Sequence, residues 1–176
     1  MTRPVLYLIS CAAGPAQHID DGVRAAQGAG WDTCLILSPT AARWWEPRMA
    51  ELEALTGHPV RHRYTLPGES GGLPKADAML VAPLTTTSAC KWADGITDTL
   101  ALGIPAEAVH MGVPVMAAPF WSTALGGQPA VGRAVATLRE QGVRVVFAPG
   151  EPHQPKQGNG EEFPWARLLG ALNGGL

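Results

Sequence analysis

The stretch from Asp77 to Leu102 constrains the fold of this 176-residue chain more than any other part of it. It opens with an apolar run at residues 78–82, which ends at Pro83. A short apolar run that ends at a breaker is typical of a strand buried on both faces of a parallel sheet. Four hydroxyl residues follow at 85–88, and then a helical spacing of apolar residues begins. The stretch therefore predicts a strand, a hydroxyl-rich turn and a helix.

Two interpretations of the hydroxyl-rich turn are open. The N-terminus of a helix presents free N–H groups, which together with neighbouring hydroxyls can hold an anion such as a phosphate. Serine and threonine are also the usual caps of helices when no ligand is involved. The spacing of the residues does not separate an anion site from an ordinary cap.

Apolar runs and helical patterns alternate along the rest of the chain. The runs predict strands at residues 4–10, 33–37, 78–82, 113–118 and 143–148, and a short, more polar segment at 59–64 is predicted as a sixth strand nearer the sheet edge. Such alternation is typical of a doubly wound, Rossmann-like α/β fold, a three-layer sandwich around a parallel six-stranded sheet. We expect a single domain over residues 1–176, in which the Gly- and Pro-rich segment 149–164 forms a flexible flap.

Composition excludes several classes of protein. A net charge of −2 gives no basic footprint for nucleic acid, and 46% hydrophobic residues with 16% charged ones indicate a folded chain. No apolar run approaches the length of a membrane span, and the first residues lack the pattern of a signal peptide. Three cysteines without CxxC spacing are expected to stay reduced, so we expect a cytoplasmic protein.

The predicted ligand site lies beyond the C-terminal ends of the strands, where doubly wound sheets bind their ligands. The turns there carry hydroxyls and small residues but almost no charge, so N–H groups, hydroxyls and helix dipoles must hold any phosphate. Such neutral donors suit the phosphate of flavin mononucleotide (FMN), whose isoalloxazine ring also needs an apolar wall. The predicted cofactor contacts are Ser10, Cys11, Ala12, Ser38, Thr40, Pro83, Leu84, Thr85, Thr87, Ser88, Met116 and Ala118. No dinucleotide-binding or P-loop motif is present.

The stretch from Asp77 to Leu102 resembles the signature of the homo-oligomeric flavin-containing cysteine decarboxylases, which include phosphopantothenoylcysteine and lantibiotic decarboxylases. The residues in register are Pro83, Thr85, Ser88, Lys91, Gly95, Ile96, Asp98 and Leu100. Residues 10–13, 38–42 and 128–143 resemble other family turns, so the resemblance spans roughly residues 4–150. It implies FMN as cofactor and a homotrimer or homododecamer. Trp44, Trp45 and Trp121 are expected to be exposed aromatics that need a partner.

The chain departs from that family mainly at the positions of the catalytic and substrate-binding residues. Glu69 stands where the decarboxylases place a histidine, and Thr87 stands where they have an asparagine. The substrate-binding turn is Phe120-Trp121-Ser122 after Pro119, and the flap has no cysteine. The resemblance thus implies a divergent member. Glu69 is its candidate catalytic base, because a carboxylate in a pocket beside a flavin can have a raised pKa.

Three functions remain open. The first is an FMN enzyme that decarboxylates or oxidises a small thiol or peptide. The second is a non-catalytic flavin-binding accessory subunit, and the third, a flavin prenyltransferase relative, is disfavoured because its Arg-Glu-Thr turn is missing. His58 and His62 share one face of a predicted strand, but no third ligand stands in spacing, so no metal is expected. His153 lies in the predicted flap, from which it can enter the site.

Overall fold

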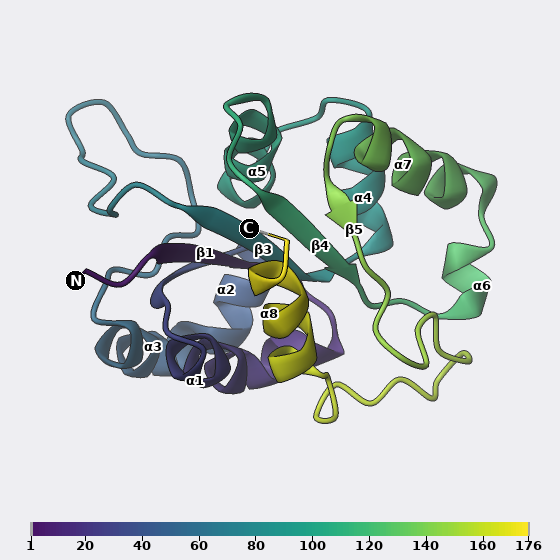
Figure 1. The fold of residues 1–176 in the computed structure, drawn as a ribbon, viewed down its shortest axis with the longest axis horizontal. Coiled ribbons are helices and arrows are strands. Elements are labelled where there is room, and N and C mark those ends of the chain that lie inside the picture. The colour runs from purple at the N-terminus through teal and green to yellow at the C-terminus, as the bar shows by residue number, and fades with distance from the viewer. Residues whose placement is uncertain (1, 176) are drawn as a thin grey trace.

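A parallel β-sheet forms the middle layer of the molecule, and the computed structural model describes residues 2–175 (Figure 1). The strand order is β2-β1-β3-β4-β5, and every pairing is parallel. The strands are β1 (Val5–Ser10), β2 (Asp32–Leu37), β3 (Ala78–Leu84), β4 (Val115–Pro119) and β5 (Arg144–Val145). The predicted α/β fold with a parallel sheet is therefore confirmed.

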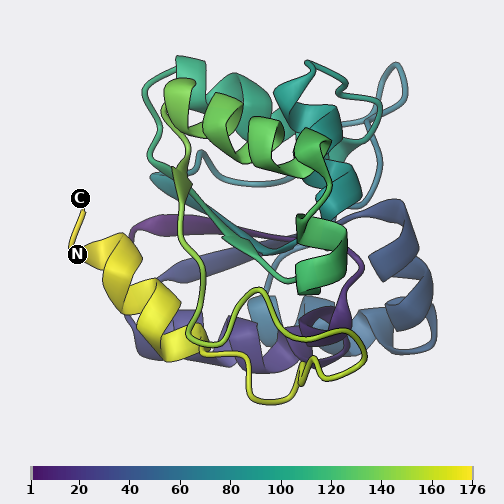
Figure 2. The ribbon, with the colours of Figure 1, turned by 90° about the vertical axis from the view of Figure 1, so that its right-hand side faces the viewer.

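Helices cover both faces of this sheet (Figure 2). They are η1 (Gly14–His18), α1 (Ile19–Gly28), α2 (Pro39–Trp45), η2 (Glu46–Arg48), α3 (Met49–Thr56), α4 (Thr86–Ala93), α5 (Leu100–His110), α6 (Thr123–Gly126), α7 (Pro129–Glu140) and α8 (Trp165–Asn173). One apolar cluster packs the sheet against α1, α2, α3 and α8. A second cluster packs the opposite face against α4, α5 and α7. In the described part of the chain, no helix has the length and apolarity needed to cross a membrane.

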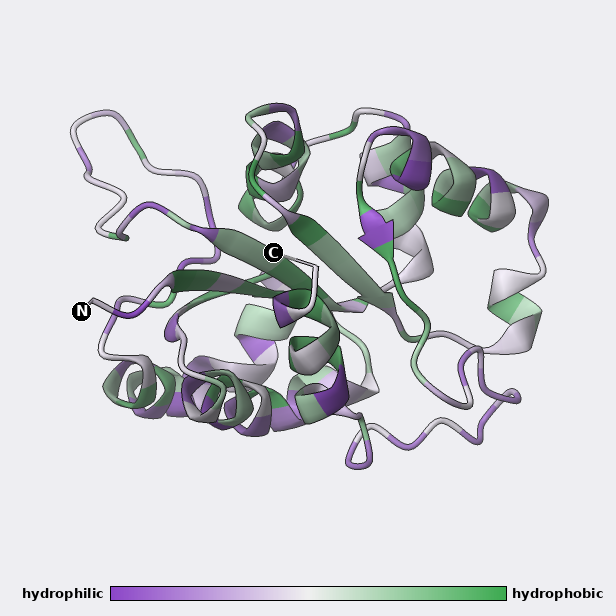
Figure 3. Cartoon of the chain, in the orientation of Figure 1, coloured by the Kyte–Doolittle hydropathy of each residue, from purple (hydrophilic) through white to green (hydrophobic). Residues whose placement is uncertain are grey.

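The central strands are hydrophobic along their length (Figure 3), which is what burial on both faces requires. All seven residues of β3 are buried, and β1 and β4 pair with it on either side. Thr85 then leaves the sheet in an extended conformation, and its hydroxyl accepts a hydrogen bond from the N–H of Ser88 at 3.2 Å. The strand, hydroxyl turn and helix predicted from residues 77–102 are present.

The prediction of six strands is wrong for residues 2–175, in which the sheet has five. Residues 59–64 make only one isolated bridge, between Ile36 and Arg61. Residues 62–64 are exposed, so no packing holds this segment as a strand, and the chain continues as a long loop beyond the sheet (Figure 1). The last predicted strand is shortened to Arg144–Val145, and Phe147 beyond it packs edge-on against Trp121.

The segment between β5 and α8 packs back onto the sheet edge. The N–H of His153 donates to the carbonyl of Trp121 at 3.2 Å, and the N–H of Thr123 donates to the carbonyl of His153 at 2.7 Å. Further along, a Cβ atom added to Gly160 would overlap the backbone of Gly14. Residues 149–164 are thus joined to the turns after both β1 and β4, and their flexibility stays a prediction.

The contact between α1 and α8 generates a stability prediction. A Cβ atom at Gly22 in α1 would lie 3.0 Å from the indole ring of Trp165 in α8. Because overpacking a filled interface forces side chains and backbone to shift, Gly22→Leu should lower the free energy of unfolding by about 1–3 kcal/mol. Urea unfolding monitored by circular dichroism measures this change.

Gly132 in α7 provides the matched control for this substitution. It occupies the fourth position of its helix, as Gly22 does, and a Cβ atom there meets nothing within 4 Å. Gly132→Leu should leave stability unchanged or raise it by about 0.5–1 kcal/mol through helix propensity. Equal effects of the two substitutions would contradict the packing described for α1 and α8.

Candidate functional site

The turns after β1, β2 and β3 are hydrogen-bonded to one another at the C-terminal edge of the sheet. The N–H of Ser38 donates to the carbonyl of Ser10 at 2.9 Å, and the N–H of Cys11 donates to the carbonyl of Pro83 at 3.1 Å. In the order β2-β1-β3, the chain reverses its direction of progress between β1 and β3. This switch point is the place where doubly wound sheets bind ligands.

The N-terminus of α4 supplies free donors at this switch point. Thr85 caps the helix, so the N–H of Ser88 is satisfied by its hydroxyl. The N–H groups of Thr86 and Thr87 have no hydrogen-bond partner among residues 2–175, as expected for the first turn of a helix. Thr86 is half-buried and Thr87 is exposed, so both face a ligand that approaches the edge.

Cys11 lies between these turns as a buried thiol. Burial raises the pKa of this thiol, and hydrogen bonds from the Ser88 hydroxyl and the Thr85 backbone oppose the shift in part. The group is therefore a neutral thiol at neutral pH rather than a reactive thiolate. Its contact with Ser88 ties the turn after β1 to the first turn of α4.

The predicted cofactor contacts divide into surface and interior groups. Ser38, Thr40, Thr85, Thr87, Ser88 and Ala12 keep exposed or half-buried positions at the edge. The six others are buried: Ser10, Cys11, Pro83, Leu84, Met116 and Ala118. The hydroxyl of Ser10 donates to the carbonyl of Cys11 at 3.4 Å, and Met116 and Ala118 belong to the cluster under α1 and α8. The interior group can contribute backbone or shape but exposes no side-chain surface.

Aromatic side chains fill the turn after β4. Phe120 packs with its ring centroid 4.6 Å from His153 and 6.0 Å from Phe163. Trp121 packs edge-on against Phe147 at 5.7 Å. The hydroxyl of Ser122 caps α6 by accepting from the N–H of Leu125 at 3.2 Å. The predicted substrate-binding turn is thus an ordered aromatic wall.

The expectation that Trp45 and Trp121 are exposed is wrong. Each is only 4% exposed, while Trp44 is 45% exposed as predicted. The indole N–H of Trp45 donates to the carbonyl of Ala16 at 2.7 Å, which gives the buried ring a polar anchor. Trp44 borders a surface hollow with Gln17 and Arg48.

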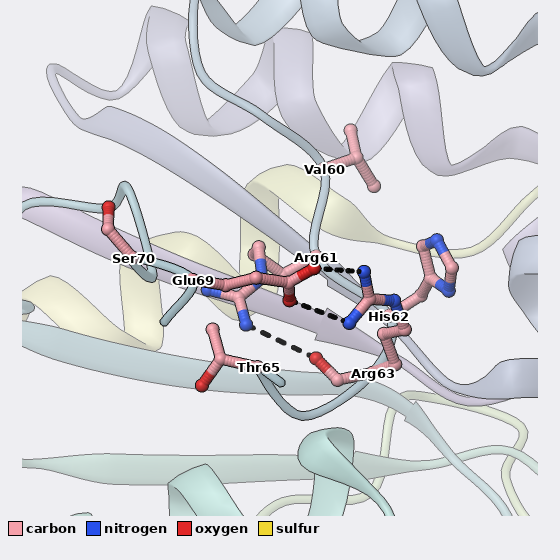
Figure 4. A pocket seen from close by; sticks show the side chains of 7 residues that line it. All are labelled: Val60, Arg61, His62, Arg63, Thr65, Glu69 and Ser70. Atoms are coloured by element: carbon pink, nitrogen blue, oxygen red, sulfur yellow. Dashed lines mark hydrogen bonds and ion pairs between the residues drawn. The ribbon is translucent and has the colours of Figure 1, made fainter. Parts of the chain in front are cut away.

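Glu69 lies in the long loop before β3, in a hollow of ≈ 430 Å³ beside Arg61 and His62 (Figure 4). Its carboxylate accepts two hydrogen bonds from Arg63, at 2.8 and 3.0 Å, and one from the N–H of Leu66 at 2.9 Å. These bonds, the Arg63 guanidinium first, lower the pKa of Glu69 to about 2. The shift is opposite in direction to the raised pKa on which the sequence interpretation relied, and a role for Glu69 as base stays a prediction.

The two histidines considered for a metal do not pair. His58 Nε2 lies 2.7 Å from a carboxylate oxygen of Asp32, and His62 is exposed. Within residues 2–175, no three His, Cys, Asp or Glu side chains are grouped as metal ligands.

The sequence pointed to His153 in the predicted flap but not to its pairing with Glu151. Nδ1 of His153 lies 3.0 Å from both carboxylate oxygens of Glu151. The pair borders a cavity of ≈ 170 Å³ beside Phe120. Its only signal in the sequence is the spacing of two residues within a Gly- and Pro-rich segment, which by itself indicates a loop.

Comparison with known proteins places this geometry in a family. A family profile described as Flavoprotein matches residues 58–172. The crystal structure of SpaF, described as an FMN-dependent cysteine decarboxylase, is 27% identical, with a TM-score of 0.70 over 97% of this chain and 96% of SpaF.

Two further structures show the fold alone. MrsD from Bacillus sp. HIL-Y85/54728 is 16% identical, with a TM-score of 0.74 over 98% of this chain and 95% of its own. The FMN-binding protein AtHal3 is 16% identical, with a TM-score of 0.71 over 98% and 96%. No curated protein sequence matches at a significant level. The profile covers well over half of the chain, which therefore belongs to the Flavoprotein family.

Proposed function

We propose that the chain binds FMN at the switch point between β1 and β3 and uses it on a small thiol-bearing substrate. The observation that carries this proposal is the strand order β2-β1-β3-β4-β5 with donor-bearing turns gathered at one edge. Flavodoxin-like sheets of this order bind FMN at the same switch point. Family membership and the likeness to SpaF, described as FMN-dependent, support the same cofactor.

The donor set at this edge fits a flavin phosphate. The free N–H groups of Thr86 and Thr87 supply neutral donors, and the hydroxyl residues Ser38 and Thr40 stand across the edge. A phosphate held by N–H groups and a helix dipole needs no lysine or arginine beside it. Bound FMN would supply an acceptor for the two electrons of a thiol oxidation.

Substrate binding is assigned to the turn Phe120-Trp121-Ser122. Trp121 is buried and shapes the turn from within, whereas Phe120 borders the ≈ 170 Å³ cavity and favours a ligand with apolar surface there. Glu69 favours the second candidate function, a non-catalytic flavin-binding subunit, because its carboxylate is exposed and bound to Arg63. The missing Arg-Glu-Thr turn leaves a prenyltransferase relative as the weakest candidate.

We propose that the protein assembles as a homotrimer or homododecamer in the cytoplasm. The exposed indole of Trp44 and the reduced state of Cys11, Cys34 and Cys90 support these two statements.

The first functional prediction concerns one backbone donor. Proline suits the first position of a helix but lacks an N–H, and Thr85 already has the extended conformation that a following proline requires. Thr86→Pro should therefore keep α4 and weaken FMN binding roughly tenfold or more, since a hydrogen bond to a charged group contributes about 1.5–3 kcal/mol. Quenching of flavin fluorescence on titration measures the affinity.

Thr86→Ala is the matched control, because it removes the side chain but keeps the N–H. It should bind FMN nearly as the unchanged protein does. Equal affinities of the two variants would remove the α4 N-terminus from the phosphate site. Failure of the unchanged protein to bind FMN at all would end the cofactor proposal.

The second functional prediction concerns substrate. Glu69, Thr87 and the turn 120–122 depart from the decarboxylase pattern, and the described flap has no cysteine. Since a lost acid or base costs about 10²- to 10⁴-fold, the FMN-loaded protein should release carbon dioxide from phosphopantothenoylcysteine at least about 100-fold more slowly than a true decarboxylase. Turnover at the normal rate would contradict this, and its loss in Glu69→Gln would assign the base to that carboxylate.

The third functional prediction is the assembly. Light scattering from the FMN-loaded protein at micromolar concentration should give the mass of a trimer or of a dodecamer. A monomer under these conditions would refute the assembly, and Trp44 would then be an isolated exposed aromatic.

A further inference from the structure

The segment between β5 and α8 carries a polar pair that the proposed function has not used. Glu151 and His153 border the ≈ 170 Å³ cavity, together with Phe120, Gln157 and Asn159. The side chain of Glu151 is 9% exposed and that of His153 is 17% exposed. A carboxylate and an imidazole so far removed from water are costly unless each satisfies the other.

The geometry fixes the tautomer of His153. An ionised carboxylate only accepts hydrogen bonds, so Nδ1 of His153 must be the donor to Glu151 at 3.0 Å. When the imidazole is neutral, its lone pair then stands on Nε2. Carboxylates orient catalytic and ligating histidines in this manner in many proteins.

Gly158 lies directly beside this Nε2 atom. A Cβ atom at Gly158 would lie 2.6 Å from Nε2, closer than any real contact. Gly158 has no positive φ angle, so its backbone does not require glycine. Glycine is therefore needed at position 158 because a side chain there would collide with the ring of His153.

The pair stands over the turn assigned to substrate. The ring of His153 lies 4.6 Å from that of Phe120, and the backbone of His153 is hydrogen-bonded to Trp121 and Thr123. Glu162 is the other carboxylate that lines the cavity. Among the histidines of the described chain, His153 alone borders this cavity.

We propose that His153 is the acid–base residue of this site and that Glu151 positions it. The assignment rests on the proposed flavin-dependent thiol chemistry. In the proton step, the S–H bond of a substrate thiol breaks, its proton forms an N–H bond at Nε2, and the electron pair stays on sulfur as thiolate. The Glu151 carboxylate balances the charge of the imidazolium, which later returns the proton to water.

Full-length protein loaded with FMN and mixed with a peptide that ends in cysteine tests this assignment. His153→Gln should slow the bleaching of the flavin absorbance about 100-fold or more while FMN affinity is unchanged, and the melting temperature should fall, because the buried Glu151 loses its charged partner. His110→Gln is the matched control, because that exposed histidine ends α5, away from the cavity. It should react as the unchanged protein does.

Substitutions of Glu151 and Gly158 test whether these residues act on the rate through His153 or only stabilise the fold. Glu151→Gln should lower kcat with little change in KM, and Glu151→Asp should restore part of the rate by restoring the charge. Gly158→Ala should lower the rate although both members of the pair remain, because its methyl group covers Nε2. Gly132→Ala, at a position with open space, is its control.

Nitrogen NMR of the imidazole provides a readout without substrate. In the unchanged protein, Nδ1 of His153 should carry the proton and Nε2 should be bare when the ring is neutral. The reverse tautomer would overturn the proposal, and so would His153→Gln with the unchanged protein's rate. If the unchanged protein binds no FMN, or its flavin is not bleached by the thiol, the proposed function and this assignment both fail.

Discussion

The position of β3 between β1 and β4 is the constraint on which the rest of the structure depends. All seven residues of β3 are buried, so the strand must lie in the middle of the sheet with a helical layer on each face. Thr85 is the first residue after β3 that is only half-buried, so it is the first position at which a polar side chain can reach solvent or a ligand. The hydroxyl turn, the start of α4 and the neighbouring turn at Cys11 therefore meet at one edge because a strand ends there.

Continuous apolar runs made much of this fold predictable. Where such runs are missing, the predicted secondary structure or exposure was wrong. Residues 78–82 could be predicted as a strand because an apolar run of this kind indicates burial on both faces, although the strand continues through Pro83 to Leu84. Residues 59–64 were predicted as a short, more polar strand near the sheet edge, but Arg61 and His62 have no layer to pack against. Burial of Trp45 was not predictable, because it depends on the carbonyl of Ala16, which only the fold brings near. Predicted contacts such as Ser38 and Ser88 were identified by residue type, yet the sequence could not show that Met116 and Ala118 lie in the interior.

Two glutamates show how surroundings, rather than residue type, decide what a carboxylate can do. Glu69 stands in solvent with an arginine, where its charge is stabilised and its affinity for a proton falls. Glu151 stands nearly out of solvent with a histidine, to which it gives a fixed orientation. The sequence favoured Glu69 because of its place in the family pattern. Its partner Arg63 is only six residues away, but no pattern showed that the two would meet.

The contact between Gly14 and Gly160 has a consequence for the order in which the edge is built. The two residues touch through backbone atoms, although almost the whole chain separates them in sequence. During synthesis, the strands and the turns after β1 and β3 exist well before residue 160 leaves the ribosome. In a nascent chain the turn at Gly14 is therefore uncovered until the late segment docks on it, so this contact is among the last parts of the edge to form.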